Sequence, residues 1–215
     1  MSQYIDIRKE KTGTVVAELI EALKSGQVII APTDTLYGLL ADAFQETAVR
    51  QIYHMKQRPE GMPLPLIAGS PAQVSEVVVF SRLAQRLADR FWPGPLTLAL
   101  PALERVPEFL KAEDGTLAIR IPAHSLCREL ALGVGRPLTA TSANLSGQPA
   151  ARAIADLAAD LANQVYAVVD QGTLTAEKPS TILKVTEEQY RVVREGAIPV
   201  QEIQASLGED IFEEG

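Results

Sequence analysis

The residues of this chain that could do chemistry form short polar clusters beside predicted strands and helices. The first, Thr33-Asp34-Thr35, follows the apolar run Val28–Ala31 and Pro32. The run predicts a buried strand, and Pro32 ends its pairing because proline has no N–H to donate. Open α/β sheets bind ligands at the ends of strands. These groups are therefore candidates for a binding site, and an ordinary turn, which uses the same residue types, is the alternative.

Two cations follow in a loop that proline and glycine make irregular. Lys56 and Arg58 are one residue apart, and Pro59 biases Arg58 toward an extended conformation. An ammonium and a guanidinium held in this way can converge on one polyphosphate. The alternative is a pair of solvated cations near a helix C-terminus, where positive charge is favourable.

One further cation interrupts a predicted strand. Arg120 stands within the apolar run Leu117–Ile121, so its charge needs an anion at the sheet face or in a crevice. A carboxylate of the protein itself and a carboxylate or phosphate of a ligand are both open as that partner.

Hydroxyl groups gather in two more segments. Residues 139–147 hold Thr139, Thr141, Ser142, Ser146 and the amide of Asn144. Small residues there let backbone N–H groups approach an anion. The alternative is a loop that caps a helix predicted at 152–162. Ser180 and Thr181 begin another predicted strand, and Arg194 ends one.

The elements that must position these clusters alternate along the chain. Helices are predicted between residues 12 and 26 and at 45–56, 71–78, 82–91, 124–132, 152–162 and 199–207. Strands are predicted at 4–7, 28–31, 64–68, 96–100, 117–121, 138–139, 165–169, 181–185 and 190–194. Several loops are too short for a crossover helix, which favours mixed pairing. We predict a single α/β domain at 1–208, with one twisted sheet of parallel and antiparallel strands and flanking helices, and an acidic tail at 209–215.

Composition narrows the possible functions. The 215 residues carry a formal net charge of -7, and residues 1–208 alone carry -3 because the tail holds four acids. An acidic body argues against broad nucleic-acid binding, which needs a dense basic face. The single cysteine, Cys127, excludes an internal disulfide and is expected to be a packed core thiol. The start of the chain is not typical of a secretion signal, and no apolar run predicts a membrane span. We therefore expect a cytoplasmic protein with no membrane association.

Known phosphate and hydrolase signatures are missing. The chain has no G-x-x-x-x-G-K-[ST] and no H-E-x-x-H. Two histidines and one cysteine give no zinc-ligand spacing, so no metal site formed by side chains is predicted.

Seven short motifs, in order, cover most of the chain. They are Pro32-Thr33-Asp34-Thr35-x-Tyr37-Gly38-Leu39, Lys56-x-Arg58-Pro59, Trp92-Pro93-Gly94-Pro95-Leu96-Thr97, Arg120-x-Pro122, Ser142-Ala143-Asn144-x-Ser146-Gly147, Ser180-Thr181-Ile182 and Arg194-x-Gly196. Each motif alone is weak, but the ordered set resembles the YrdC/TsaC family of threonylcarbamoyl-AMP synthases.

The resemblance implies a fold with a deep, partly basic concave groove. It implies that ATP, L-threonine and bicarbonate (or CO₂) give threonylcarbamoyl-AMP and pyrophosphate, with Mg²⁺ held mainly by the phosphates. A separate transferase complex would then use the product to modify tRNA.

The resemblance also suggests roles for individual residues. Lys56 and Arg58 would be catalytic. Thr33, Thr35, Arg120, Ser180 and Thr181 would bind threonine. Lys56, Arg58, Thr141, Ser142, Asn144 and Arg194 would bind the nucleotide.

Two alternatives from the sequence stay open. One is an RNA-binding module that uses the same groove without catalysis, and even the enzyme could bind RNA weakly. The other is an enzyme that forms a carbamoyl adenylate with a different acceptor. Met62 departs from the residue types of some relatives, so nucleotide contacts from its loop are less well specified than those of Lys56 and Arg58.

Overall fold

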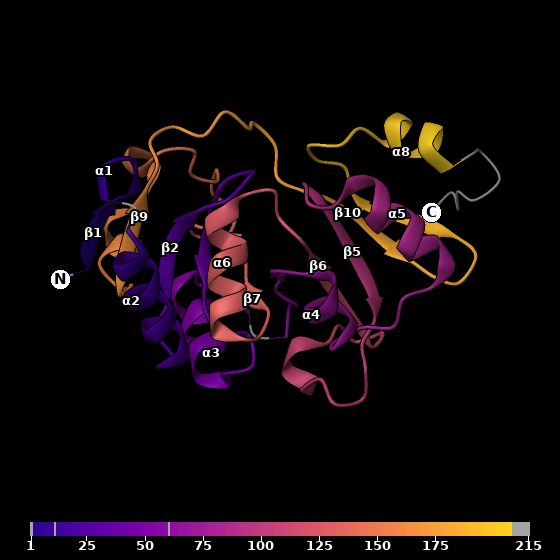
Figure 1. Ribbon diagram of the computed structural model, residues 1–215, viewed down its shortest axis with the longest axis horizontal. Coiled ribbons are helices and arrows are strands. Elements are labelled where there is room, and N and C mark those ends of the chain that lie inside the picture. Colours follow the sequence, from indigo (N-terminus) through magenta and orange to yellow (C-terminus); the bar gives the residue numbers. More distant parts are fainter. Residues whose placement is uncertain (1, 11, 60, 208–215) are drawn as a thin grey trace.

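The computed structural model describes residues 2–10, 12–59 and 61–207, and its strands form two sheets that lie side by side (Figure 1). The five-stranded sheet has the order β1 (Gln3–Asp6), β9 (Ala167–Asp170), β2 (Ile29–Pro32), β3 (Tyr37–Leu40) and β8 (Thr141–Ser142). The six-stranded sheet has the order β11 (Tyr190–Arg194), β10 (Thr181–Val185), β5 (Leu96–Pro101), β6 (Thr116–Arg120), β4 (Leu66–Ile67) and β7 (Leu138–Thr139).

Both sheets mix parallel and antiparallel pairing. β9 is parallel to β1 and β2, whereas β3 is antiparallel to β2 and β8. In the six-stranded sheet β5 is parallel to β10, and β4 is parallel to β6. The remaining neighbours there are antiparallel. The predicted α/β class with mixed pairing is confirmed, and the strands divide between two sheets where the sequence suggested one.

The two sheets meet where the chain passes from one to the other. β7 belongs to the six-stranded sheet and β8 to the five-stranded sheet, with only Ala140 between them. Thr139 of β7 also bonds across the junction, because its hydroxyl accepts from Ala41 N at 2.9 Å. The junction is therefore fixed by both backbone and side-chain contacts.

Eight α-helices and two short 3₁₀ turns, η1 and η2, complete the described part of the chain. They are α1 (Ile7–Glu10), α2 (Gly13–Lys24), α3 (Glu46–Met55), α4 (Pro71–Ser75), α5 (Arg82–Phe91), α6 (Ser125–Val134), α7 (Ala159–Ala162), α8 (Val200–Leu207), η1 (Glu108–Leu110) and η2 (Ile154–Asp156). Most of them match predicted ranges, and α2 begins and ends as predicted. Thr12 caps it by accepting from Val15 N at 3.3 Å, and Gly26 follows it with a φ of 80°.

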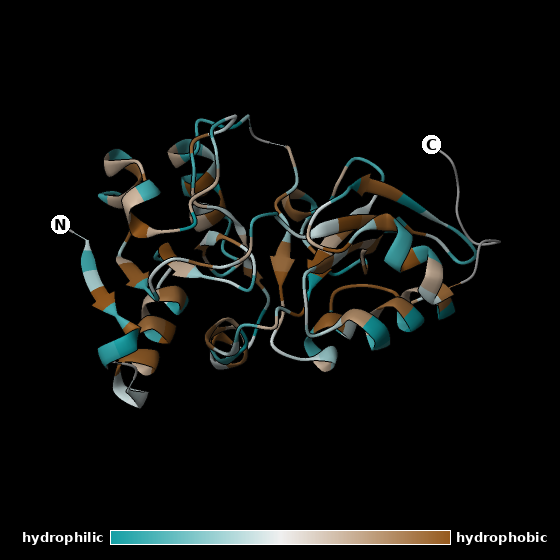
Figure 2. Ribbon diagram, turned by 90° about the horizontal axis from the view of Figure 1, so that it is seen from above, coloured by the Kyte–Doolittle hydropathy of each residue, from teal (hydrophilic) through white to brown (hydrophobic). Residues whose placement is uncertain are grey.

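The five-stranded sheet is covered on both faces. Ile29 and Ala31 of β2 pack in one core with α2 and α6, whereas Ile30 packs in the other core, where α3 contributes Ile52. Alternate residues of a strand point to opposite faces, so a strand covered on both sides is apolar throughout. Figure 2 shows the same pattern, with hydrophobic residues along the strands and on one side of several helices.

The prediction of one continuous helix at 152–162 is wrong. The structure has the short η2 and α7 there instead. Asp156 accepts from the backbone N–H groups of Arg152 and Ala153 at 2.9 Å, and Leu174 N donates to Arg152 O. Asp156 thus caps η2 at Ala153, and extended backbone at Leu157 and Ala158 separates η2 from α7.

Two further predictions concern the C-terminal tail and membrane association. The acidic tail at 209–215 lies outside the described residues. None of the helices in the described ranges is both long and apolar enough to cross a membrane.

We predict that Gly196→Ala destabilises the protein. A Cβ at this position would lie 2.3 Å from the carbonyl oxygen of Pro179, and backbone atoms cannot move away easily. Overpacking of this kind costs about 1–3 kcal/mol. For a chain of this size Tm falls by about 2–4 °C for each kcal/mol. Gly13→Ala is the matched control, because a Cβ there meets nothing within 4 Å. Equal melting temperatures for Gly196→Ala and Gly13→Ala would contradict the prediction.

Candidate active site

A pocket of about 330 Å³ lies at the junction of the two sheets, and Ala140 is part of its wall. The turn after β2 brings Thr33 and Thr35 from the side of the five-stranded sheet. Arg120, at the end of β6, and Ser180, just before β10, come from the side of the six-stranded sheet. The pocket therefore exists only because the two sheets meet.

Nine of the eleven predicted site residues line this pocket. They are Thr33, Thr35, Arg58, Arg120, Thr141, Ser142, Asn144, Ser180 and Arg194. Lys56 and Thr181 are outside its lining. A larger hollow of about 780 Å³ lies beside Arg58, but it contains no other predicted residue. The predicted chemistry is therefore concentrated in the smaller pocket, and the individual roles stay predictions.

The turn at residues 33–36 is held by its own hydroxyl groups. Thr33 Oγ1 donates to Leu36 O at 2.7 Å and accepts from Thr35 N and Leu36 N at 3.1 and 3.2 Å. Thr35 Oγ1 lies 3.0 Å from Thr33 Oγ1. The Thr33 hydroxyl thus shapes the turn, and Thr35 presents its hydroxyl beside Arg120.

Arg120 has a protein partner, which the sequence had left open. Its Nη1 donates to Asp34 Oδ1, and the other oxygen of Asp34 accepts from Ala123 N at 3.0 Å. Arg120 Nη1 also lies 3.3 Å from Gly94 O, and Nη2 lies 3.4 Å from Thr35 Oγ1. The ion pair does not exclude a ligand, because Arg120 still lines the pocket.

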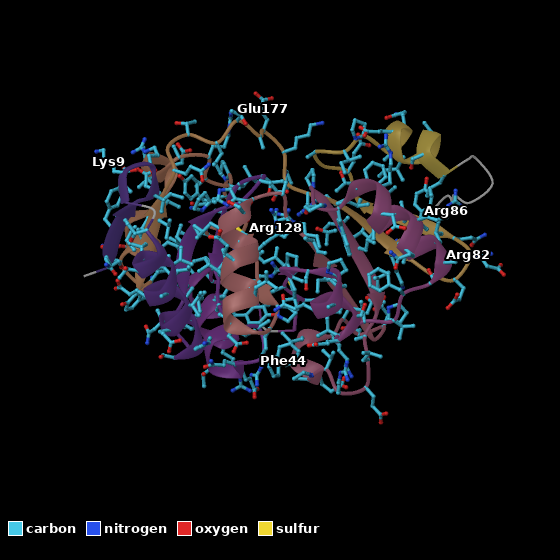
Figure 3. The ribbon with its side chains drawn as sticks, viewed as in Figure 1. Lys9, Phe44, Arg82, Arg86, Arg128 and Glu177 are labelled. Carbon is cyan, nitrogen blue, oxygen red and sulfur yellow. The ribbon has the colours of Figure 1, made fainter. Side chains whose placement is uncertain are left out.

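The segment after Arg120 is fixed by a second arginine. Arg128 Nη1 donates to Pro122 O and Ala123 O at 2.7 and 2.6 Å. Figure 3 shows Arg128 on α6, in the middle of the molecule. The backbone N–H that bonds Asp34 is therefore itself held in place.

Ser180 lies between a buried threonine and an arginine. Its hydroxyl is 2.8 Å from Thr97 Oγ1, and Arg194 donates from Nε and Nη2 to Ser180 O at 3.2 and 2.8 Å. The pKa of Arg194 is lowered, first by its partial removal from water and then by the charge of Arg120. Arg120 and Arg194 both line the pocket, and two positive charges in one pocket favour a bound anion.

Lys56 ties helix α3 to the loop after β8. Its Nζ donates to Ser142 O, to Asn144 O at 2.7 Å and to Asn144 Oδ1 at 3.3 Å, and Ser146 N donates to Lys56 O. The side chain is buried, and this burial, followed by the charge of Arg58, lowers its pKa to about 8. The predicted phosphate-binding lysine thus holds Ser142, at the end of β8, and the loop that carries Asn144.

Arg58 reaches the pocket through an unusual backbone turn. Gln57 has a φ of 50°, and the N–H groups of Gln57 and Arg58 donate to His54 O and Tyr53 O. This arrangement ends α3 with a left-handed residue, a position that usually takes glycine. It sends Lys56 and Arg58 in different directions. Arg58 Nε is buried and has no hydrogen-bond partner in the described part of the chain.

The Thr181 hydroxyl bonds to backbone groups, and Thr181 is not part of the pocket lining. Its hydroxyl donates to Ile198 O at 2.7 Å and accepts from Gly196 N and Ile198 N at 3.0 Å. It therefore fixes the turn that follows Arg194. Thr141 does line the pocket, and the Asn144 amide donates to Gln148 O at 2.6 Å.

Among the other residues of the pocket wall, two have polar side chains that the sequence analysis did not select, Tyr37 and Gln148. The Tyr37 hydroxyl donates to Gly172 O at 2.7 Å and accepts from Gln171 N at 3.0 Å, which links the turn after β2 to the segment after β9. Burial raises its pKa to about 12. Tyr37 belongs to the first of the seven motifs, so that motif was the available signal.

The pocket is positively charged although the chain is acidic. Arg58, Arg120 and Arg194 line it, and none of the described residues in its wall is acidic. The described residues contain no group of three or more histidine, cysteine, aspartate or glutamate side chains placed to hold a metal ion. The site suits a multiply charged anion, and a divalent cation would have to come with that anion.

Cys127 takes no part in the pocket. It is fully buried and donates to Pro32 O at 3.2 Å, and burial raises its pKa to about 12. The expectation of a packed core thiol is confirmed.

Fold and site together define a mixed α/β protein with an arginine-lined substrate pocket between two sheets. A family model named Sua5_yciO_yrdC, with the description "Telomere recombination", matches residues 21–196. The chain belongs to this Sua5/YciO/YrdC family.

Individual relatives are similar over most of the chain. A putative threonylcarbamoyl-AMP synthase of Methanocaldococcus jannaschii is 34% identical over 198 residues, which are 92% of this chain and 93% of the relative. The threonylcarbamoyl-AMP synthase of Pyrococcus abyssi is 36% identical over 188 residues, 87% of this chain but only 55% of that longer protein. The crystal structure of P. abyssi Sua5 complexed with L-threonine matches with a TM-score of 0.88 at 31% identity, covering 99% of this chain and 62% of that one.

We predict that binding of a non-hydrolysable ATP analogue, the ligand type implied by the resemblance, weakens severalfold between about pH 7 and pH 9. Above its pKa of about 8 the Lys56 amine has only two N–H groups for three carbonyl oxygens, so the loop carrying Ser142 and Asn144 loosens. Titration calorimetry measures the affinity. Lys56→Met should bind the analogue more weakly and without this pH dependence.

Unfolding does not explain such a loss. The pKa of Lys56 is lower in the folded protein than its ordinary value of 10.5. The unfolded chain therefore holds more protons between about pH 8 and 10.5, and the contribution of Lys56 to stability rises with pH there. Equal affinities at pH 7 and pH 9 in the unmodified protein would contradict the role of its ammonium.

Proposed function

We propose that this protein is an L-threonylcarbamoyladenylate synthase, a nucleotidyltransferase that makes threonylcarbamoyl-AMP and pyrophosphate from L-threonine, bicarbonate or CO₂, and ATP. The observation that carries the proposal is the single pocket where Arg58, Arg120 and Arg194 converge with the hydroxyl and amide groups of Ser142, Asn144 and Ser180. Relatives that align with most of this chain carry the same name.

The threonine end of the site is supported by the surroundings of Arg120. An amino-acid carboxylate can accept from Arg120 Nη2, whose one contact among the described residues is the long one to Thr35. Thr35 and Ser180 supply hydroxyls within the same pocket for the polar groups of threonine. The relative crystallised with L-threonine supports this assignment.

The nucleotide end is supported by the other two arginines and the loop after β8. Arg58 and Arg194 can neutralise phosphate charge, and Ser142 and Asn144 can bond phosphate or ribose oxygens. Lys56 would contribute by holding that loop as well as by its charge. Magnesium would enter with the triphosphate, because the described wall of the pocket offers it no carboxylate.

The reaction then proceeds by positioning and charge neutralisation. With CO₂, the threonine amine forms a bond to its carbon and releases one proton to solvent. With bicarbonate, the C–OH bond breaks, and the departing hydroxide takes the proton from nitrogen and leaves as water. A carbamate oxygen attacks the α-phosphorus, and the bond from that phosphorus to the β-phosphate oxygen breaks. Pyrophosphate leaves with its charge offset by Arg58 and Arg194. No general base is needed for the attack, since the carbamate is already an anion.

The product would be used by a separate tRNA-modifying transferase complex. Weak RNA binding and a cytoplasmic location stay predictions from the sequence. Residues 1–208 as the catalytic domain also stay a prediction.

The fate of labelled ATP tests the function. We expect pyrophosphate to be released only when threonine and bicarbonate are both present, with label at the α-position appearing in the adenylate product. Pyrophosphate release that is indifferent to threonine, or release of ADP and inorganic phosphate, would contradict the proposal. A product formed with another amino acid in place of threonine would favour an enzyme with a different acceptor. RNA binding without any ATP turnover would favour the RNA-binding alternative.

Arg58→Ala tests the charge-neutralising role. We expect turnover to fall by at least about a hundredfold, the scale on which such groups contribute, while the fold survives. Arg50→Ala is the matched control, because this exposed arginine lies on α3 and pairs with Glu46 away from the pocket. Turnover in Arg58→Ala equal to that in Arg50→Ala would remove Arg58 from the mechanism.

A further inference from the structure

Asp34 lies behind the pocket and pairs with an arginine that lines it. Asp34 follows β2 of the five-stranded sheet, whereas Arg120 ends β6 of the six-stranded sheet. Their side chains are 9% and 6% exposed, so the ion pair is almost fully removed from water. Arg120 lines the pocket, but Asp34 is not part of its lining. Asp34 can therefore act on a bound molecule only through Arg120.

The contacts of Asp34 determine which side of the Arg120 guanidinium faces the pocket. Nη1 donates to Asp34 Oδ1 and lies 3.3 Å from Gly94 O. Nη2 has only the 3.4 Å contact to Thr35 Oγ1 within the described ranges, which is long for a hydrogen bond. One side of the planar group is thus committed to the protein, and the other is left for a stronger acceptor.

Asp34 is held more firmly than a surface carboxylate would be. Its second oxygen accepts from Ala123 N at 3.0 Å, and the carbonyl of Ala123 accepts from Arg128. A carboxylate fixed by a backbone N–H can in turn fix the guanidinium, because a charged hydrogen bond is short and directional.

We propose that Asp34 is a positioning residue that orients Arg120 to receive the carboxylate of the amino-acid substrate. The proposal rests on the proposed function, because it requires an amino-acid substrate in this pocket. Asp34 also supplies negative charge behind a wall that contains three arginines and, among the described residues, no acid. Without Asp34 the buried Arg120 would lose its partner and would turn toward other acceptors.

A merely structural role is the alternative. Asp34 connects the two sheets, and its removal could lower stability without changing how Arg120 meets the substrate. The two roles differ in what they predict for threonine and for ATP. A positioning role changes the KM for threonine in protein that is folded, whereas a structural role changes Tm alone.

The experiment is a steady-state analysis of Asp34→Asn, with pyrophosphate release as the measured signal. Asparagine keeps the size of the side chain and an oxygen for Ala123 N, but it loses the charge that holds Arg120. We expect the KM for threonine to rise at least about tenfold while the KM for ATP changes by less than about twofold. Arg120→Lys is then measured alone and together with Asp34→Asn. Alone it should weaken threonine binding, and when it is added to Asp34→Asn it should weaken binding little further.

Asp42→Asn is the matched control. Asp42 is also buried, accepts from Phe44 N at 2.9 Å and has an arginine partner, Arg136, at 3.8 Å, but it is outside the pocket lining. We expect this control to leave the KM for threonine unchanged even if Tm falls.

The possible failures are distinguishable. Unmodified protein that does not couple pyrophosphate release to threonine contradicts the proposed function. If that coupling is present and Asp34→Asn keeps an unchanged KM for threonine, the positioning role is overturned and the function stands. If Asp34→Asn does not fold, Asp34→Ser is measured in the same way, and an unchanged KM for threonine in folded Asp34→Ser overturns the role equally.

Discussion

A buried guanidinium group is stable only with an anion beside it, and the pocket of this protein depends on which anion pairs with Arg120. Arg120 belongs to the six-stranded sheet, and its partner Asp34 belongs to the turn that follows a strand of the five-stranded sheet. The ion pair therefore crosses the junction of the two sheets and fixes the pocket between them. Breaking one partner of a buried pair leaves an uncompensated charge, which is far more costly than losing a surface salt bridge.

The cations around the pocket differ in whether they line it or only fix a segment beside it. Lys56 and Arg128 direct their donors at backbone carbonyl groups, and each of them fixes a loop beside the pocket. Arg58 and Arg194 line the pocket, and each also donates to one backbone carbonyl oxygen, that of Pro63 for Arg58 and that of Ser180 for Arg194. An acidic protein can thus present a positive pocket, because three of its arginines line the pocket and none of the described acidic residues does.

Lys56 shows why a residue type does not by itself give a role. A lysine next to an arginine in a stiff loop predicts phosphate binding, and that prediction stays open. The structure adds that Gln57 is left-handed, so the two cations point in different directions from neighbouring positions. The Lys56 ammonium reaches one oxygen of Ser142, at the end of β8, and two of Asn144, in the loop that follows, while Arg58 faces the pocket. Backbone geometry that no local pattern revealed decides this difference.

By itself the sequence determined the α/β class, most of the helices and strands, the core position of Cys127 and nine of the residues that line the pocket. These follow from local signals, because periodicity, caps and polar residues at strand ends depend on near neighbours along the chain. Only the tertiary structure decided the division into two sheets, the partner of Arg120, the direction of the Thr181 side chain away from the pocket, and the break in the helix predicted at 152–162. The first three depend on contacts between segments distant in sequence, such as Asp34 with Arg120 or Thr181 with Ile198. Local propensity carries no information about such contacts. They contribute to stability only in the folded protein, where the two sheets pack together.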